Sequence, residues 1–260
     1  MDSPGEVAAP GDSGEPGQPR EPGQAAQPGE PGPTAPPRTH GRLGKRLALA
    51  WYAIARGLVE LVCRLYWRVE IRGQDNVPRW GAYVIAPVHR SNIDTLLAGC
   101  LTHRRIRFMG KDTLWKYRWS GTLFSSLGAF PVHRGTPDRE ALRVCEAAAR
   151  GGEPVVLFPE GTRQSGPNLQ PLFEGAAFVA ARAGVPILPV GIGGSEWAMP
   201  KGKKRILPVK VVMVVGEPIP APERAPGARL ARRAVTEVTD ELAERLQALF
   251  DQALKAAGRA

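Results

Sequence analysis

One histidine and one aspartate have a spacing that suits acid–base chemistry. His89 and Asp94 are separated by four residues. The short, apolar stretch at residues 83–86 predicts a buried strand, and residues 93–101 predict a helix. His89 would then follow the strand, and Asp94 would lie in the first helical turn. A carboxylate folded back onto the imidazole fixes its tautomer, so that the ring can take a proton from a substrate hydroxyl. A core or capping histidine is the alternative for this spacing taken alone.

Composition and charge restrict the possible partners. The 260-residue chain has room for one α/β domain with a sizeable core and additional segments. Its formal net charge of +10 is uneven, because residues 1–40 carry −4 and the remainder carries +14. A body this basic indicates an anionic partner, such as a phosphate-bearing substrate, an anionic membrane surface or a nucleic acid. The sequence has no recognisable nucleic-acid-binding motif, so we expect no nucleic acid partner.

The cysteines predict neither a metal site nor a disulfide framework. Cys63, Cys100 and Cys145 lie far apart in apolar helical patterns, and the sequence has no C-x-x-C pair or His/Cys cluster. We expect buried, reduced thiols in a cytosolic protein, no metal and no bound cofactor.

Residues 1–40 predict a disordered tail. They are rich in Pro, Gly, Ala, Glu and Gln, and they contain almost no large apolar groups that could form a core. The tail also lacks the basic start and apolar centre of a secretory signal. We expect it to have no catalytic role.

Residues 41–68 predict an amphipathic helix that associates with a membrane. Arg56, Glu60 and Arg64 recur every four residues and form one polar stripe on an otherwise apolar helix. The stripe argues against a spanning helix, which needs about 20 residues nearly free of charge. Basic residues at the start and interfacial aromatics suit a helix in the headgroup region. The aromatic candidates are Trp51, Tyr52, Tyr66 and Trp67. A core helix packed on the domain is the alternative.

Residues 69–260 alternate short strands with helices. Strands are expected near 69–71, 83–86, 106–109, 154–158, 185–190 and 209–215, and helices near 93–101, 136–150, 175–183 and 229–253. The loop at 195–205 is strongly basic. This alternation predicts an α/β domain in which a mixed central sheet is flanked by helices.

Four short patterns follow one another in this domain. They are H-x4-D at 89–94, G-A-F-P-V-x-R at 128–134, F-P-E-G-T-R at 158–163 and V-P-I-x-P-V at 185–190. Together they resemble the glycerolipid acyltransferase family, typified by 1-acylglycerol-3-phosphate acyltransferase, over about residues 45–215. The resemblance implies that residues 69–260 are an acyltransferase domain. Such a domain moves a fatty acyl group from a thioester, either acyl-CoA or acyl carrier protein, to a hydroxyl on a glycerol phosphate.

The resemblance also implies roles for individual residues. His89 would act as the general base on the acceptor hydroxyl, and Asp94 would hold it. A thioester is already activated, so no serine or cysteine nucleophile is needed, and the sequence has no G-x-S-x-G motif. Arg134 and Arg163 would contact the acceptor phosphate, because a guanidinium fork can bond two oxygens.

Four further residues complete the predicted substrate-binding set. Lys111 is another candidate phosphate ligand, and a solvated surface charge is its alternative. Glu160 would hydrogen-bond the glycerol hydroxyls, and a helix-cap carboxylate is its alternative. Gly161 and Thr162 follow Glu160 in the same motif.

The sequence departs from the family pattern in two places. His133 precedes Arg134 where family members often carry aspartate, and Glu174 stands where lysine or another residue is common. Both departures bear on which phosphate-bearing acceptor fits.

These features predict an enzyme that acylates 1-acylglycerol-3-phosphate to phosphatidic acid in phospholipid biosynthesis. Its partners would be a lysophosphatidic acid-type acceptor, the acyl donor and an anionic membrane surface. We expect a peripheral or monotopic location at the cytoplasmic side of the cell membrane. The alternatives are the same chemistry on glycerol 3-phosphate, a lysophospholipid or a glycolipid, and a thioester hydrolase in which water replaces the alcohol.

Overall fold

The structure is a computed structural model that describes residues 42–132, 139–203, 205–222 and 230–259, with side chains from residue 50 onward. The tail predicted at residues 1–40 lies outside the described residues, and so do His133 and Arg134.

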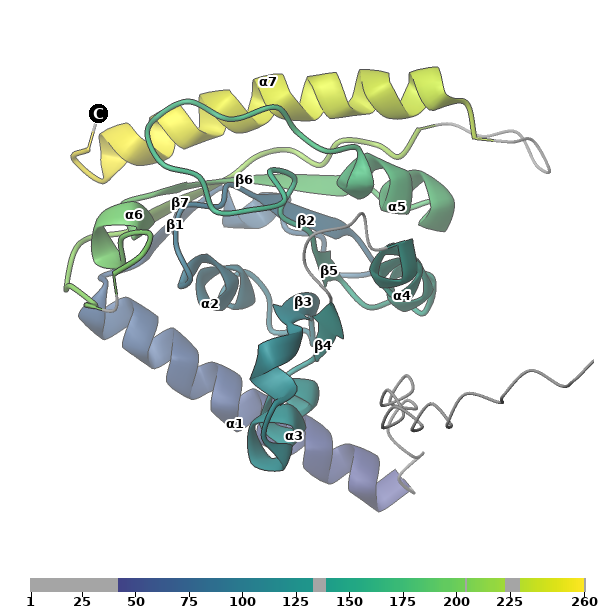
Figure 1. Ribbon diagram of the computed structural model, residues 1–260, viewed down its shortest axis with the longest axis vertical. Coiled ribbons are helices and arrows are strands. Elements are labelled where there is room, and N and C mark those ends of the chain that lie inside the picture. Colours follow the sequence, from purple (N-terminus) through teal and green to yellow (C-terminus); the bar gives the residue numbers. More distant parts are fainter. Residues whose placement is uncertain (1–41, 133–138, 204, 223–229, 260) are drawn as a thin grey trace, which may run out of the picture. The chain divides into compact units, whose positions relative to one another are not determined.

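A seven-stranded sheet organises the described chain (Figure 1). Its strands lie in the order β1-β7-β6-β2-β5-β3-β4, and neighbouring strands are parallel except for β6 and β7. The strands are β1 (Glu70–Arg72), β2 (Val84–Pro87), β3 (Arg107–Lys111), β4 (Ala129–Val132), β5 (Val155–Val156), β6 (Ile187–Gly193) and β7 (Val212–Val215). The predicted fold class, a mixed central sheet flanked by helices, is confirmed.

Helices cover both faces of the sheet. Those packed on one face are α4 (Arg139–Arg150), α5 (Gly175–Ala183) and α7 (Arg232–Ala256), and those on the other are α1 (Arg42–Tyr66) and α2 (Asp94–Gly99). Successive side chains of a strand point to opposite faces. Val84 and Ala86 therefore pack with α4, α5 and α7, whereas Tyr83 and Ile85 pack with α1 and α2. Both faces are buried, which explains the continuous apolar run in the sequence.

The long helix α7 lies directly against β6. Gly191 and Gly193 permit this approach, because a Cβ atom at either position would lie 2.3 Å from backbone atoms of Leu249 or Ala253. The buried side chains of α7 recur mostly every three or four residues, which is the pattern of an amphipathic helix. They are Val235, Thr239, Leu242, Leu246, Phe250, Ala253 and Leu254.

Some predicted elements are shorter than the sequence suggested. Residues 154–158 contribute only Val155–Val156 to the sheet, and residues 209–215 pair as β7 from Val212 onward. The loop predicted at 195–205 begins with a short helix, α6 (Ser195–Ala198). The segment between β3 and β4 contains a 3-10 turn (Asp112–Trp115) and the helix α3 (Arg118–Ser126).

Helix α1 packs with Arg56 and Glu60 of its polar stripe turned toward the domain, whereas the third member, Arg64, is 65% exposed. Arg56 and Glu60 form an ion pair at 2.8 Å with side chains only 14% and 17% exposed, and Arg56 Nη2 lies 2.7 Å from His103 Nδ1. The predicted interfacial role of Tyr52 and Trp67 is wrong, because both side chains are buried in the packed face.

The opposite side of α1 is an apolar face that the described chain leaves largely exposed, although Trp51 Nε1 donates a hydrogen bond to Ser126 Oγ of α3 at 3.2 Å. Its side chains are 44–72% exposed and recur mostly every three or four residues. They are Trp51, Ile54, Leu58, Leu61, Val62 and Leu65, and we call them the apolar face of α1. Among the described helices, none is both long enough and apolar enough to cross a bilayer.

The strand directions place several strand ends along one edge of the sheet. Strands β2 to β6 are mutually parallel, so their last residues lie along the same edge of the sheet. We call this the carboxyl edge. Open α/β sheets bind ligands outside the carboxyl ends of their strands.

Candidate active site

His89 and Asp94 meet at the carboxyl edge. His89 follows β2, and Asp94 is the first residue of α2, as the sequence predicted. His89 Nδ1 and Asp94 Oδ2 are 3.1 Å apart, and the side chains are 10% and 0% exposed. An ionised carboxylate only accepts hydrogen bonds, so Nδ1 carries the hydrogen in the neutral ring and Nε2 keeps its lone pair. The pair can therefore hold an imidazole ready to accept a proton at Nε2.

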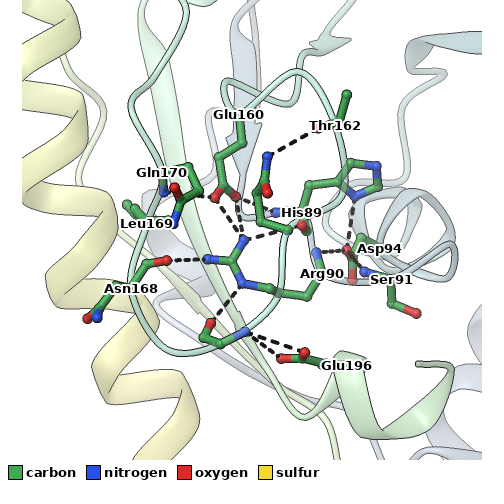
Figure 2. A network of polar contacts seen from close by, with 12 residues as sticks. His89, Arg90, Ser91, Asp94, Glu160, Thr162, Asn168, Leu169, Gln170 and Glu196 are labelled. Atoms are coloured by element: carbon green, nitrogen blue, oxygen red, sulfur yellow. Dashed lines mark hydrogen bonds and ion pairs between the residues drawn. The ribbon is translucent and has the colours of Figure 1, made fainter. Parts of the chain in front are cut away.

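Backbone amides fix the carboxylate in place. Asp94 Oδ2 accepts hydrogen bonds from the backbone N–H groups of Arg90 and Ser91, each at 2.6 Å. These donors and His89 Nδ1 converge on one oxygen (Figure 2). The turn between β2 and α2 therefore sets the orientation of the carboxylate before any substrate binds.

The ring of Phe158, in the segment after β5, packs against the His89 imidazole. The two rings are stacked, with centroids 3.9 Å apart and planes at 22°. Phe158 begins the F-P-E-G-T-R segment, which follows β5, and β5 pairs with β2. Sequence reasoning assigned no role to this ring, because the contact depends on which strands are neighbours.

A buried ion pair joins the turn after β2 to the segment after β5. Arg90 Nη1 donates to both carboxylate oxygens of Glu160, at 2.8 and 2.7 Å, and both residues are 1% exposed. Glu160 also accepts hydrogen bonds from the backbone N–H groups of His89 at 3.0 Å and Gln170 at 3.3 Å. The prediction that Glu160 binds glycerol hydroxyls stays untested. In this structure the Glu160 carboxylate is buried, and both of its oxygens accept hydrogen bonds. It therefore positions His89 and the loop after β5.

Arg90 also holds the loop that follows Glu160. Its Nε donates to Gly166 O and its Nη2 to Asn168 O, both at 3.1 Å (Figure 2). The guanidinium carbon lies 4.8 Å from the centroid of the Phe250 ring. Sequence reasoning missed Arg90, because an arginine is mostly exposed unless a partner is available. Its position next to His89 in the motif was the available signal.

The other predicted substrate-binding residues lie around this centre. Lys111 ends β3 at the carboxyl edge and is exposed. Gly161 adopts a positive φ of 68°, which suits glycine at the turn after Glu160. Thr162 is exposed, and its hydroxyl accepts a hydrogen bond from Gln164 Nε2 at 3.1 Å. Arg163 is half-buried. Substrate contact by these four residues stays a prediction.

Ser91 connects the site to the segment after α6. Its buried hydroxyl donates to Met199 O at 2.9 Å. Glu196 of α6 accepts a hydrogen bond from the Gly166 N–H at 3.2 Å, so α6 also restrains the loop that Arg90 holds. Within the described residues, no group of three or more His, Cys, Asp or Glu side chains could hold a metal ion.

Comparisons with known proteins agree on one family. A family model described as Acyltransferase matches residues 68–193, which include His89, Asp94 and the F-P-E-G-T-R segment. The chain is 29% identical over 207 residues to the 1-acyl-sn-glycerol-3-phosphate acyltransferase of Bacillus subtilis, covering 77% of this chain and 99% of that protein. It is 31% identical over 147 residues to the chloroplastic BAT2 enzyme of that name from Brassica napus, covering 55% of this chain and 42% of the relative.

A solved structure has the same fold. The structure described as the 1-acyl-sn-glycerophosphate (LPA) acyltransferase PlsC of Thermotoga maritima superposes with a TM-score of 0.58. It is 22% identical in sequence, and the match covers 79% of this chain and 88% of that chain.

The buried ion pair predicts a large stability effect. We expect Arg90→Met and Glu160→Gln each to lower the free energy of unfolding by about 3–5 kcal/mol, because each leaves its partner buried and unpaired. The double variant should lose less than the sum of the two, since it leaves no unpaired charge. Urea unfolding followed by circular dichroism measures all three.

The matched control is Arg72→Met. Arg72 forms a surface ion pair with Glu70 whose side chains are 51% and 39% exposed, so the loss should stay below about 1 kcal/mol. Single variants at Arg90 and Glu160 as stable as this control would contradict the role of the ion pair.

Proposed function

This chain belongs to the glycerolipid acyltransferase family, a family of O-acyltransferases, and on that premise we propose that it acylates 1-acylglycerol-3-phosphate to give phosphatidic acid. Curated relatives from Bacillus subtilis and Pseudomonas aeruginosa carry the name of that activity. The observation that best supports the proposal is the buried contact of His89 with Asp94 at the carboxyl edge. It provides a base where ligands bind in open α/β sheets.

In the proposed reaction, His89 Nε2 takes the proton of the acceptor hydroxyl as that oxygen attacks the thioester carbonyl. Asp94 stabilises the resulting imidazolium through Nδ1. When the tetrahedral intermediate collapses, the C–S bond breaks and the imidazolium returns its proton to the departing thiolate. The products are the new ester and a free thiol. We propose acyl-CoA or acyl carrier protein as the donor, because either supplies an activated thioester.

We propose that cationic side chains around the carboxyl edge bind the acceptor phosphate. Arg163 lies three residues beyond Glu160, whose carboxylate is anchored, and Lys111 ends the strand next to β5. Arg134, outside the described residues, completes this set. A guanidinium fork can bond two phosphate oxygens, which would favour a phosphorylated acceptor over a neutral one.

We propose that the apolar face of α1 lies in the headgroup region of a membrane. The arrangement of α1 supports this, because the ion pair of Arg56 with Glu60 is turned inward and the large apolar side chains are exposed. An amphipathic helix buries such a face in the boundary between headgroups and acyl chains. A lipid acceptor would then reach the enzyme from the bilayer surface.

The proposed base predicts a catalytic loss without unfolding. We expect His89→Ala and Asp94→Asn to lower transfer from radiolabelled acyl-CoA to lysophosphatidate by about 10²–10⁴-fold, because positioned acid–base catalysis contributes that much. His103→Ala is the matched control, since this exposed histidine contacts Arg56 and lies outside the site. Thermal melting monitors folding of all three variants. Normal turnover by folded His89→Ala would rule out the base.

The exposed face of α1 predicts membrane binding. We expect the triple variant Ile54→Gln, Leu58→Gln and Leu65→Gln to reduce partitioning onto phospholipid vesicles by about 100-fold or more, because each side chain loses apolar burial. These side chains are 62–72% exposed, so the fold should be retained. Vesicle flotation measures binding.

Phe178→Gln on α5 is the control for removing an exposed apolar side chain elsewhere, since Phe178 is 38% exposed. Flotation of the α1 variant at the wild-type level would show that its apolar face does not contact the membrane.

A further inference from the structure

A basic loop follows α6, and the catalytic residues do not use it. We define the basic loop as the described residues 200–203 and 205–206. Lys201, Lys203 and Arg205 are exposed, and Ile206 is 46% exposed. Within the described part of the chain, no carboxylate forms an ion pair with these three cations. The loop therefore presents uncompensated positive charge next to an exposed apolar side chain.

The topology places the basic loop at the carboxyl edge. Strand β6 ends there at Gly193, α6 follows, and β7 begins at Val212, which pairs with Gly193. The loop consequently leaves and returns at the edge where His89 lies. The hydrogen bond from Ser91 Oγ to Met199 O, at 2.9 Å, ties the start of the loop to the turn that carries the catalytic pair.

The same loop borders the C-terminal end of α1. Tyr66 Oη donates to Ile206 O at 3.1 Å, and Arg68 Nη2 donates to Pro208 O at 3.4 Å. A backbone bond from Val211 N to Trp67 O, at 3.0 Å, fixes the chain just beyond. In Figure 1 the segment after α6 reaches the end of α1 that leads into β1. The C-terminal end of α1 and the basic loop are therefore neighbours.

This combination fits the surface of an anionic bilayer. Exposed apolar groups enter the boundary of the acyl chains, whereas lysine and arginine lie at the level of the phosphates and bind anionic headgroups. An acidic protein would also be attracted by the charge. It would not account for the exposed apolar side chains of Leu65 and Ile206, which are 72% and 46% exposed. The observations therefore favour a lipid surface over a protein partner.

We propose that the basic loop binds anionic phospholipid headgroups and, together with the C-terminal end of α1, holds the carboxyl edge against the bilayer. The inference rests on the proposed function, since it specifies how the enzyme meets its lipid acceptor. Two elements then share the membrane contact. The apolar face of α1 supplies affinity for any bilayer, and the basic loop supplies preference for anionic lipid and the orientation of His89 toward the surface.

A charge-reversal pair in the full-length chain tests the loop. The variant is Lys201→Glu with Lys203→Glu, and its matched control is Arg143→Glu with Arg232→Glu, at exposed positions on α4 and α7 with the same change in net charge. Flotation compares vesicles of neutral phosphatidylcholine with vesicles in which about a third of the lipid is anionic phosphatidylglycerol.

We expect the loop variant to partition about 30-fold or more less onto anionic vesicles and to bind neutral vesicles as the wild type does. The control should stay within about 3-fold of the wild type on both, because its positions lie away from the proposed contact surface. Raised salt should reduce the wild-type preference for anionic vesicles, since ions screen the attraction. The α1 variant should lose binding to both kinds of vesicle.

Two outcomes would overturn the inference. An equal loss by the control would show that net charge, and not the loop, determines binding. Wild-type vesicle binding by the loop variant, with transfer reduced only when acyl carrier protein is the donor, would identify a protein partner instead. Acylation of a short-chain, water-soluble lysophosphatidate by the wild type tests the proposed function separately, because that assay contains no vesicles.

Discussion

The buried guanidinium group of Arg90 requires hydrogen-bond acceptors for its N–H groups. Arg90 lies in the turn after β2, and it finds acceptors in the loop after β5. Its ion pair with Glu160 and its bonds to Gly166 and Asn168 hold the loop after β5 against the turn after β2. That turn carries His89, and the Glu160 carboxylate accepts the His89 backbone N–H. The proposed catalytic geometry thus depends on a charge pair that is stable in the interior only while both partners remain.

The helix proposed to contact the membrane ends at the carboxyl edge of the sheet. β1 is parallel to β7, which runs antiparallel to β6, so the C-terminal end of α1 arrives at the carboxyl edge. Exposure of the apolar face of α1 to water is unfavourable. Large exposed apolar patches of this kind usually mark an interaction site. The proposed membrane contact and the proposed base are therefore both associated with the carboxyl edge.

The sequence predicted what depends on local pattern and left open what depends on pairing between distant segments. The strand before His89 and the helix after it predicted the contact with Asp94, because a short turn determines that geometry. The stacking of Phe158 and the burial of Arg90 require β2 and β5 to be neighbours, which periodicity does not reveal. Likewise, the α1 pattern identified two faces, but only packing shows that Tyr52 is buried beside an exposed Trp51.

The tautomer of His89 tests the central claim most directly. Nitrogen-15 NMR of histidine-labelled protein at neutral pH, assigned with a His89 variant, distinguishes a protonated ring nitrogen from one with a free lone pair. The account predicts hydrogen on Nδ1, where Asp94 accepts it, and a free lone pair on Nε2. A neutral ring with hydrogen on Nε2 would contradict the account, because that nitrogen could not then accept the proton of the acceptor hydroxyl.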